Sequence, residues 1–332
     1  MVQRSSLLLL VGTLAVSGCA GEGGVTQPTP PGSAAGSPTS PDAYLESVLT
    51  IMQTASVNRA EIDWPAFRAT VMERAAGART VAEVFPAILV ALQLLGDHES
   101  YVTTREGGLI GPPPVGGCGG AARVPDDLPE TVGYVQIASC DCQGNAATQF
   151  AESIQQAIER ADRPGLSGWI VDLRGNIGGN MWPMIAGIGP VLGEGIIGWI
   201  VYYNREYERE YRDGAALSLG EAFAQVPVPY RVLQEYPKVA VLTDGGVASA
   251  GEAVVVFFKG RPNTRSFGTP TCGHHHLQET FPLSDGSTLS LATSQHADRT
   301  KQRYGGPIAP DEFVDDPAEA GRRAIAWLQG GR

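Results

Sequence analysis

Basic residues are scarce in this chain. Lysine and arginine number 24 against 35 aspartates and glutamates, so the formal net charge is −11 at pH 7. No stretch of the sequence is rich in lysine or arginine. Proteins that bind nucleic acid rely on such clusters to neutralise phosphates, so the composition excludes nucleic acid as an expected partner.

Charged residues as a whole are also few, at 18% of the chain, whereas 43% of the residues are hydrophobic. This balance excludes disorder, collagen and coiled coil as descriptions of the whole chain. Glycine and proline are plentiful instead, with 42 and 24 residues, and they indicate many loops. A length of 332 residues suits one large domain or two ordinary ones.

A hydrophobic run long enough to span a bilayer, about 20 residues, is missing at the N-terminus. Residues 7–16 form a shorter apolar run after Arg4, and the sequence VSGC follows and ends at Cys19. Small residues before a cysteine resemble a bacterial lipoprotein signal, in which residues 1–18 are removed and Cys19 receives lipid. An ordinary secretory signal with a chance cysteine is the alternative. We therefore expect a bacterial cell-envelope protein, anchored by its N-terminal lipid alone on the periplasmic or extracellular face.

Residues 19–39 lack the apolar side chains that a core requires. They are rich in proline, glycine, serine and threonine, with Val25 as their branched aliphatic residue. This composition predicts a flexible tether between the lipid and the folded part. Beyond the tether, the sequence predicts a helical subdomain at 40–100, a Gly/Pro-rich loop at 101–130 and an α/β core at 131–332.

Cysteines are few, and one of the five is the predicted lipid site. The remaining four, Cys118, Cys140, Cys142 and Cys272, allow two disulfides in three connectivities, and the sequence does not select one. Cys272 stands beside the run His274 to His276, which suggests a metal site as an alternative. Cys140 and Cys142 lack the two-residue spacing usual between zinc ligands, so we expect no metal and no cofactor.

Hydrophobic periodicity predicts helices first, then strands alternating with helices. Helical spacing begins after Ser40, recurs over Trp64–Met72, and begins again after Thr80, which fits a capping box with Glu83. From Gly133 the pattern becomes strand, helix, strand, which predicts an α/β fold. The expected core elements are strands at 133–138, 169–173, 196–203, 238–243 and 265–268, helices at 145–161, 181–191, 249–258 and 317–328, a charged excursion at 205–213 and a hairpin around Asp285-Gly286.

Two turns of small residues follow predicted buried strands. In VDLRGNIGGN a strand enters a glycine-rich turn, so the N–H groups of Gly178 and Gly179 can face an anion; a plain strand-to-helix turn is the alternative. In VAVLTDGGVASAGEAVV, Ser249 stands where a helix begins. Ser249 is therefore either a helix cap or a nucleophile, and in the second case the Ala250 N–H can stabilise an oxyanion.

A nucleophilic serine needs a base, and the chain contains five histidines. His98 lies at the end of the third predicted helix and is one candidate, although a histidine there also suits a structural helix end. His274 to His276 form the other candidate group. His296 is a weaker candidate.

The order of these segments resembles that of one family. The blocks LGDHES, VGYVQI, VDLRGNIGG, VLTDGGVASAGE, RSFGTPTCG and GGPIAPD, within residues 64–317, look like those of the tail-specific, or C-terminal processing, serine peptidases. The resemblance implies an α/β fold with a crotonase-like (ClpP-like) core and a small N-terminal helical subdomain. It also implies that Ser249 is the nucleophile and that Gly178 or Gly179, together with Ala250, binds the oxyanion.

Departures from the family pattern bear on the choice of base. Ser/Lys members carry lysine in a T-x-G-K block, where this chain has His274, so a Ser/Lys mechanism is not expected. Tricorn-like Ser/His members use a histidine in an L-x-D-x-H-S-like block, which favours His98 as the base and leaves His274 as the alternative. The glutamate that such members carry before the last block is missing here. Asp97, Tyr304 or a carboxylate elsewhere is therefore expected to orient the histidine, unless the triad is incomplete.

We accordingly expect a lipid-anchored serine hydrolase that cleaves peptide bonds of unfolded or exposed polypeptides through an acyl-enzyme. The segment between His98 and Val132 is too short for the PDZ domain of many family members. The alternative is a catalytically weak or inactive peptide- or ligand-binding protein on the same scaffold, since fold does not fix function. No pattern in the sequence encodes the oligomeric state.

Overall fold

The structure is a computed structural model, and it describes residues 40–112, 118–125, 127–202, 204–274 and 276–330. The predicted signal peptide, the lipidation site Cys19 and the tether lie outside the described residues. In the described part of the chain, no helix is both long enough and apolar enough to cross a membrane.

The N-terminal helices form where the periodicity predicted them. The Ser40 hydroxyl caps the first helix by accepting the Ala43 N–H at 3.2 Å. The predicted capping box is wrong, because a 3-10 turn precedes the third helix: Thr80 makes no side-chain cap bond, and Glu83 accepts the Arg79 N–H at 2.7 Å. The elements are α1 (Pro41–Ala55), α2 (Trp64–Ala75), η1 (Val81–Val84) and α3 (Phe85–Leu95).

A five-stranded parallel sheet, in the order β13-β10-β9-β4-β3, carries the segments with predicted chemistry. All five residues of β4 and of β9 are buried, as expected for strands covered on both faces. Its strands are β3 (Val132–Gln136), β4 (Gly168–Asp172), β9 (Val239–Thr243), β10 (Thr264–Gly268) and β13 (Glu312–Phe313).

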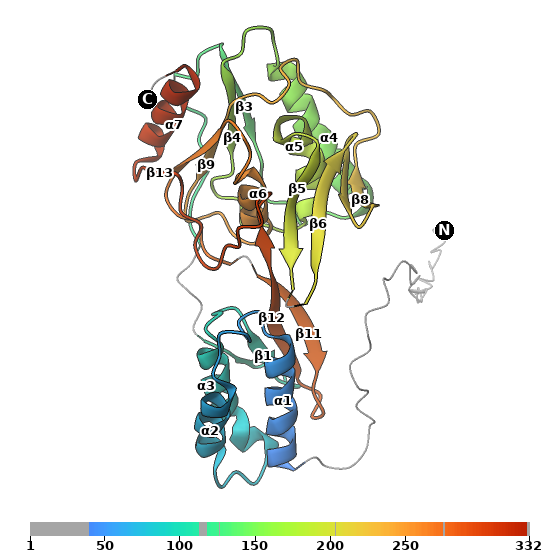
Figure 1. The fold of residues 1–332 in the computed structure, drawn as a ribbon, viewed down its shortest axis with the longest axis vertical. Coiled ribbons are helices and arrows are strands. Elements are labelled where there is room, and N and C mark those ends of the chain that lie inside the picture. Colours follow the sequence, from blue (N-terminus) through green and yellow to red (C-terminus); the bar gives the residue numbers. More distant parts are fainter. Residues whose placement is uncertain (1–39, 113–117, 126, 203, 275, 331–332) are drawn as a thin grey trace, which may run out of the picture. The chain divides into compact units, whose positions relative to one another are not determined.

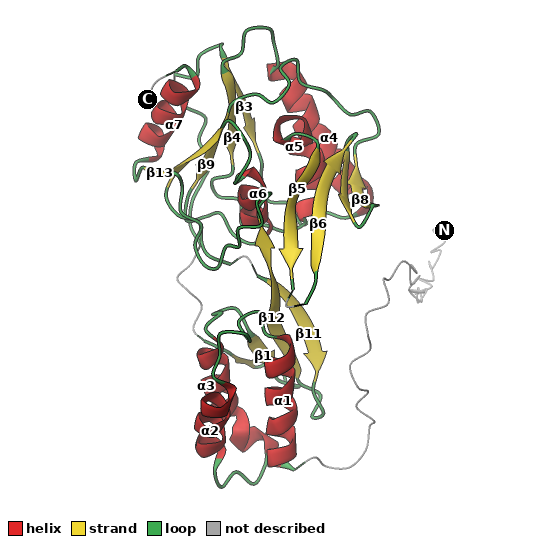
Figure 2. Cartoon of the chain, in the orientation of Figure 1, coloured by secondary structure: helices red, strands yellow, loops and turns green. Residues whose placement is uncertain are grey.

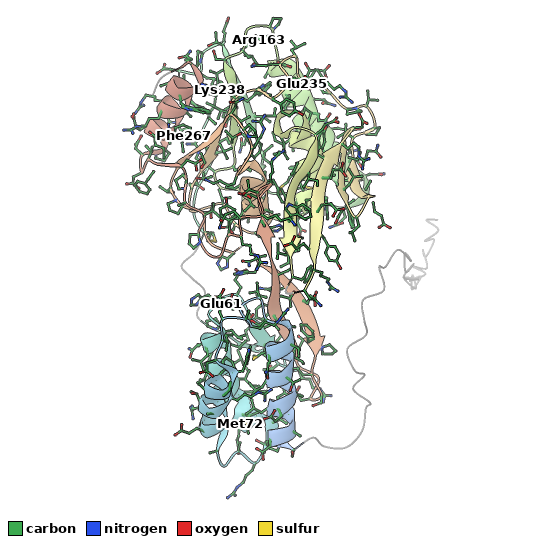
Figure 3. All side chains as sticks on the ribbon, viewed as in Figure 1. Glu61, Met72, Arg163, Glu235, Lys238 and Phe267 are labelled. Carbon is green, nitrogen blue, oxygen red and sulfur yellow. A yellow bond between two sulfur atoms is a disulfide. The ribbon has the colours of Figure 1, made fainter. Side chains whose placement is uncertain are left out.

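Helices cover both faces of this sheet (Figure 1). Side chains of three helices share one apolar core with one face, and the terminal helix packs on the other. On that second face Phe267, labelled in Figure 3, lies 6.0 Å from the Trp327 ring between centroids. The helices are α4 (Gly144–Ala161), α5 (Met181–Leu192) and α6 (Ala250–Phe258) on the first face, and α7 (Pro317–Leu328) on the second.

An antiparallel sheet in the order β2-β1-β12-β5-β6-β7-β8, with β11 also paired to β12, completes the fold (Figure 2). The hairpin predicted around Asp285-Gly286 is confirmed, because β11 and β12 flank it. Apolar side chains of β1, β11 and β12 share a second core with α1, α2 and α3. The strands are β1 (Tyr101–Thr103), β2 (Leu109–Ile110), β5 (Gly195–Val201), β6 (Glu206–Arg212), β7 (Ala215–Ser218), β8 (Glu221–Gln225), β11 (Leu277–Pro282) and β12 (Thr288–Ala297).

The segment expected as a charged excursion is instead strand β6. Burial alternates along this strand, but the many charged residues made the alternation invisible in the sequence. Arg209 and Tyr211 are buried, whereas the terminal Glu206 and Arg212 are exposed. Further differences are β1 and β2, which both lie within the segment 101–130 expected as loop and pair with each other. The core strands and helices that were predicted with bounds agree with them to within two residues, whereas β7, β8 and β13 were not predicted.

The structure selects one of the three disulfide connectivities. Cys118 pairs with Cys272, and Cys140 pairs with Cys142, with Cα–Cα distances of 5.5 and 5.2 Å. These distances fit disulfide geometry. The first bridge ties the segment before β3 to the segment between β10 and β11, which passes beside Ser249.

Candidate active site

Ser249 occupies a sharp turn between β9 and α6. Its backbone angles, φ 53° and ψ −121°, lie in a region that residues with side chains rarely adopt, and its side chain is exposed. Strain of this kind concentrates at functional sites, because the surrounding structure must hold it in place. A strained strand-to-helix turn also presents its serine hydroxyl to solvent, as in nucleophile elbows.

The buried carboxylate of Glu252 holds this turn. Glu252 is 0% exposed and accepts the N–H groups of Ser249 at 3.1 Å and Gly273 at 2.8 Å, together with the Thr271 hydroxyl at 2.5 Å. Burial raises the pKa of Glu252, and these hydrogen bonds to the carboxylate oppose that shift. The Ser249 N–H also approaches the carbonyl oxygen of His274 at 2.6 Å. The Ser249 turn and the segment 271–274 are therefore fixed to one another.

The glycine-rich turn after β4 lies against the Ser249 turn. The side chain of Asn176 is buried; its Oδ1 accepts the Gly178 N–H at 2.9 Å, and its Nδ2 donates to the Ile137 carbonyl at 3.0 Å. Its backbone oxygen accepts the Ala248 N–H at 2.9 Å. Asn176 therefore joins the carboxyl ends of β3, β4 and β9, the edge where parallel sheets commonly bind ligands.

The backbone donors predicted for an oxyanion differ in their availability. The Gly178 N–H is already bound to Asn176. In the described ranges, the N–H groups of Gly179 and Ala250 donate no hydrogen bond to the protein. Gly179 and Ala250 also line the same cavity as Ser249. These two N–H groups are consequently free to bind an oxyanion formed at Ser249.

The Ser249 side chain faces a cavity of about 610 Å³. One wall is aromatic: the Trp182 and Phe223 rings stack with centroids 4.3 Å apart, and the Arg209 guanidinium lies 5.0 Å from the Trp182 ring. Burial lowers the pKa of Arg209 to about 10. The cavity is lined by Asp141, Gln143, Gly179, Asn180, Met181, Trp182, Phe223, Ser249, Ala250, His276, Leu277 and His296.

The two bases expected from the sequence, His98 and His274, line a different cavity. This second cavity has a volume of about 450 Å³, and Ser249 is not among its lining residues. His98 itself is exposed. The histidines that share the Ser249 cavity are His276 and His296. His275, the middle member of the histidine run, lies outside the described residues.

His276 is hydrogen-bonded to a carboxylate. Its Nδ1 lies 2.7 Å from Oε1 of Glu99, and each side chain is 7% exposed. The sequence patterns do not reveal this pair, because the two residues are 177 positions apart and come from separate predicted subdomains. The signals present were the histidine run after Cys272 and the acidic residue beside His98.

The residues expected to orient a histidine have other hydrogen-bond partners. Asp97 is 5% exposed, and its Oδ1 accepts the N–H groups of Glu99 at 2.9 Å and Ser100 at 2.7 Å. Asp97 thereby fixes the backbone that carries Glu99. The Tyr304 hydroxyl donates to Asp298 at 2.9 Å, and burial together with that bond raises the pKa of Tyr304.

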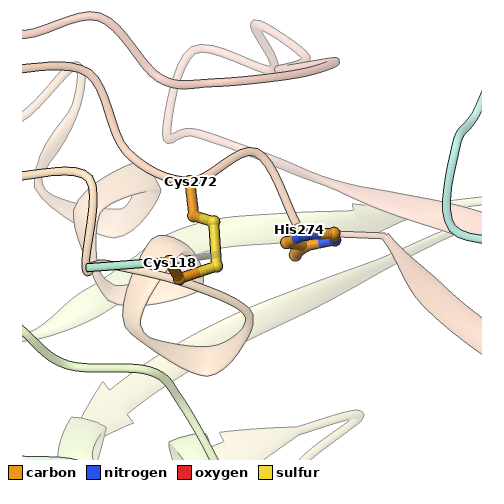
Figure 4. Close-up of side chains that lie close together, drawn as sticks. All are labelled: Cys118, Cys272 and His274. Atoms are coloured by element: carbon orange, nitrogen blue, oxygen red, sulfur yellow. A yellow bond between two sulfur atoms is a disulfide. The ribbon is translucent and has the colours of Figure 1, made fainter. Parts of the chain in front are cut away.

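One group of side chains has the composition of a metal site. The sulfur atoms of Cys118 and Cys272 and a ring nitrogen of His274 lie within 4.8 Å of one another (Figure 4). The two sulfurs are bonded to each other as a disulfide. Metal coordination requires thiolates, so this group suits a metal only after reduction.

Comparisons with known proteins agree on one family. Residues 131–314 match peptidase family S41. The nisin-resistance protein of Lactococcus lactis subsp. lactis is 25% identical over 299 residues, which cover 88% of this chain and 88% of that protein. The carboxyl-terminal-processing protease of Synechocystis sp. is 29% identical over 225 residues, 66% of this chain and 45% of that protein. A solved lipoprotein structure from Streptococcus agalactiae shares the fold, with a TM-score of 0.57, 23% identity and coverage of 88% of this chain and 97% of that one.

Proposed function

The chain belongs to peptidase family S41, and on that basis we propose that it is a lipid-anchored serine endopeptidase acting on unfolded or exposed polypeptides. Its fold is the mixed α/β fold of this family with N-terminal helices. We further propose that residues 131–332 form a crotonase-like (ClpP-like) catalytic core, preceded by the helical subdomain at 40–100 and the Gly/Pro-rich segment at 101–130.

One observation carries the proposal: an exposed serine on a strained turn, beside two unused backbone donors. Ser249 has a φ of 53° and lines the cavity that Gly179 and Ala250 also line. Ser249 and Glu252 also form a capping box at the start of α6, but a helix cap alone does not require such a backbone conformation, because ordinary caps have extended angles. The strained conformation supports the proposal that this turn holds the hydroxyl towards the oxyanion donors.

The reaction follows from this geometry. The Ser249 oxygen attacks the substrate carbonyl carbon, and a histidine accepts the hydroxyl proton as the C–O bond forms. The carbonyl oxygen becomes an oxyanion bound by the N–H groups of Ala250 and Gly179, with Gly178 as the alternative donor. The histidine then protonates the leaving amine as the C–N bond breaks. Water hydrolyses the resulting ester, releases the carboxylic acid and restores Ser249.

The sequence assigns the proton-accepting role to His98, with His274 as the alternative. That assignment rests on the position of His98 in the LGDHES block. Both histidines line the second cavity rather than the cavity of Ser249. The His274 carbonyl nevertheless accepts the Ser249 N–H at 2.6 Å, so the His274 segment passes directly beside the serine.

The membrane anchor rests on the sequence at Cys19. The lipoprotein signal pattern ends there, and the tether at 19–39 supplies a spacer to the folded part. The fold shared with a lipoprotein from Streptococcus agalactiae is compatible with this arrangement. The proposed location is the bacterial cell envelope.

A binding protein on the same scaffold is the second candidate. The observation that favours it is that neither expected base, His98 or His274, lines the cavity of Ser249, since a serine that lacks an activating base is a poor nucleophile. Such a protein would bind polypeptide in the 610 Å³ cavity and would not turn it over.

Hydrolysis of fluorescently labelled casein, an unfolded polypeptide, tests the proposal. The wild-type protein is expected to cleave it, and Ser249→Ala is expected to abolish cleavage while binding of the casein persists. Ser153→Ala, an exposed serine on α4, is the matched control and is expected to retain full activity. Wild-type activity in Ser249→Ala would refute the proposal. Casein binding without cleavage by the wild type would establish the binding protein.

A further inference from the structure

His276 and Ser249 come from neighbouring segments that the backbone holds in register. Cys272 donates its N–H to the Val247 carbonyl at 2.8 Å, just before the Ser249 turn. Ser249 in turn donates its N–H to the His274 carbonyl at 2.6 Å. His276 follows two residues later, and its side chain lines the Ser249 cavity. Backbone hydrogen bonds to Val247 and Ser249 therefore hold the segment that leads to His276.

A carboxylate orients the imidazole of His276. Oε1 of Glu99 lies 2.7 Å from His276 Nδ1, and both side chains are 7% exposed, so solvent competes little for the contact. When Nδ1 carries the hydrogen donated to Glu99, the lone pair that accepts a proton is on Nε2. The carboxylate also stabilises the imidazolium that forms when Nε2 takes up a proton.

Glu99 is itself held in position by its neighbours. Asp97 accepts its N–H at 2.9 Å, and the Gln278 side chain donates to its carbonyl at 2.8 Å. The adjacent Ser100 hydroxyl accepts the Ala292 N–H at 2.9 Å, which ties this loop to β12. These bonds fix the backbone that carries the carboxylate, from the loop after α3, from the start of β11 and from β12.

The remaining histidine of the cavity has a different environment. His296 is 4% exposed and sits within β12, with its ring edge-on to Phe257 at 5.6 Å between centroids. This packing makes His296 part of the core wall. The imidazole of His276 lies against the carboxylate of Glu99.

We propose that His276 is the general base for Ser249 and that Glu99 is its positioning residue, which rests on the proposed function of Ser249 as nucleophile. His276 Nε2 takes the Ser249 hydroxyl proton as the oxygen bonds to the substrate carbonyl carbon. It gives that proton to the amine nitrogen as the peptide C–N bond breaks. In the second half, Nε2 takes a proton from water and returns it to Ser249 as the ester C–O bond breaks.

Steady-state hydrolysis of labelled casein by the purified full-length protein tests this assignment. The variants are His276→Ala, His276→Gln, His98→Ala, Glu99→Gln and Ser249→Ala, with folding checked by circular dichroism. His276→Gln is included because its amide can still donate to Glu99 and so preserves the packing. Both His276 variants are expected to lose at least about 100-fold in kcat, the contribution of a general base. Ser153→Ala, the exposed serine on α4, is the control and is expected to stay within about threefold of the wild type.

Two further measurements distinguish a catalytic role of His276 and a positioning role of Glu99 from a merely structural role. Added imidazole is expected to restore part of the activity of His276→Ala, because it can enter the emptied site and accept the proton. Glu99→Gln is expected to lower kcat by about 10²- to 10⁴-fold with KM nearly unchanged, because the oriented tautomer is lost while the cavity remains. A purely structural role for Glu99 would instead change KM and lower the melting temperature.

The possible failures are distinguishable. If Ser249→Ala is inactive but both His276 variants keep wild-type kcat, the assignment of His276 is overturned and the proposed function survives. If His98→Ala alone loses activity, the base is His98 and the assignment is again overturned. If Ser249→Ala keeps full activity, the proposed function fails as well.

Discussion

A Cβ atom on Gly178 would lie 2.7 Å from the Cβ atom of Ser249. The same atom would lie 2.9 Å from the Ala248 oxygen and 2.9 Å from the Ala250 nitrogen, and the φ of Gly178 is +101°. The two turns after β4 and β9 therefore approach so closely that only a hydrogen atom fits between them. This contact places the glycine-rich turn against the proposed nucleophile.

Gly178→Ala is expected to reduce kcat/KM for casein by about 100-fold or more, because it displaces the Ser249 turn from its donors. Gly107→Ala is the matched control: Gly107 also has a positive φ, of +86°, but a Cβ atom there would meet nothing within 4 Å. Both variants carry backbone strain, and only Gly178→Ala carries the clash. Equal loss of activity in the two variants would contradict the importance of this contact.

Glu252→Gln is expected to destabilise the protein by about 1–3 kcal/mol, because an amide nitrogen would then face a backbone N–H or hydroxyl donor. Glu252 has three such donors around it and is 0% exposed. Urea unfolding measures the change, and kcat is expected to fall with it. Unchanged unfolding and kcat would show that Glu252 does not hold the turn.

The difference in the free energy of unfolding between the wild type and Glu252→Gln is expected to depend on pH. Burial raises the pKa of Glu252 from the ordinary value of 4.5, so in this range the folded state binds more protons than the unfolded state. Its contribution to stability is therefore fully present below pH 4.5 and is lost as the pH rises through the folded-state pKa. The stability advantage of the wild type over Glu252→Gln should accordingly shrink as the pH rises from 4.5 through the folded-state pKa. An advantage that grows with pH would contradict the raised pKa.

The aromatic wall of the cavity predicts a preference for apolar substrate side chains. Phe223→Ala is expected to raise KM for casein about tenfold with little change in kcat, because it removes the ring stacked on Trp182. Leu219→Ala, an exposed residue between β7 and β8 that does not line the cavity, is the control. Equal KM values for the two variants would refute the contribution of this wall.

The Cys118–Cys272 disulfide is expected to stabilise the segment that carries His274 and His276. Cys118→Ser combined with Cys272→Ser should lower the free energy of unfolding by about 2–5 kcal/mol. It should also lower kcat, since Cys272 lies beside the contacts to Glu252 and Ser249. Urea unfolding with and without reducing agent measures the effect. Insensitivity of the wild type to reductant would argue against a role for the bridge.

Elements with strong local patterns were predictable from the sequence. The stripe Leu45, Val48, Leu49 and Met52 is buried in α1, and α7 spans the predicted bounds. The strands β4 and β9, which are apolar except for their last residues, were equally clear, because buried parallel strands need no alternation. In β6 the buried Arg209 packs on the Trp182 ring. Because a charged residue occupies a position where an apolar one is expected, the sequence did not indicate this strand.

Of the candidate site, only the residues located directly after a buried strand were predictable from the sequence. Ser249, Gly178 and Gly179 each follow a buried strand, so adjacent parallel strands bring them to one edge. The contact between Glu99 and His276 depends on the packing of the α3 loop against β11, and no spacing in the sequence encodes it. His98 and Glu99 are neighbours in the chain, and only the three-dimensional structure distinguishes which one reaches the histidine run.

Covalent labelling shows whether Ser249 is an activated nucleophile, on which the proposed reaction depends. The purified protein would be incubated with a fluorophosphonate, which reacts with activated serines, then digested and analysed by mass spectrometry. We expect one adduct on the peptide containing Ser249, its absence in Ser249→Ala, and no adduct on Ser153. A folded wild-type protein that remains unlabelled at Ser249, or that is labelled equally at Ser153, would contradict the assignment of Ser249 as the nucleophile.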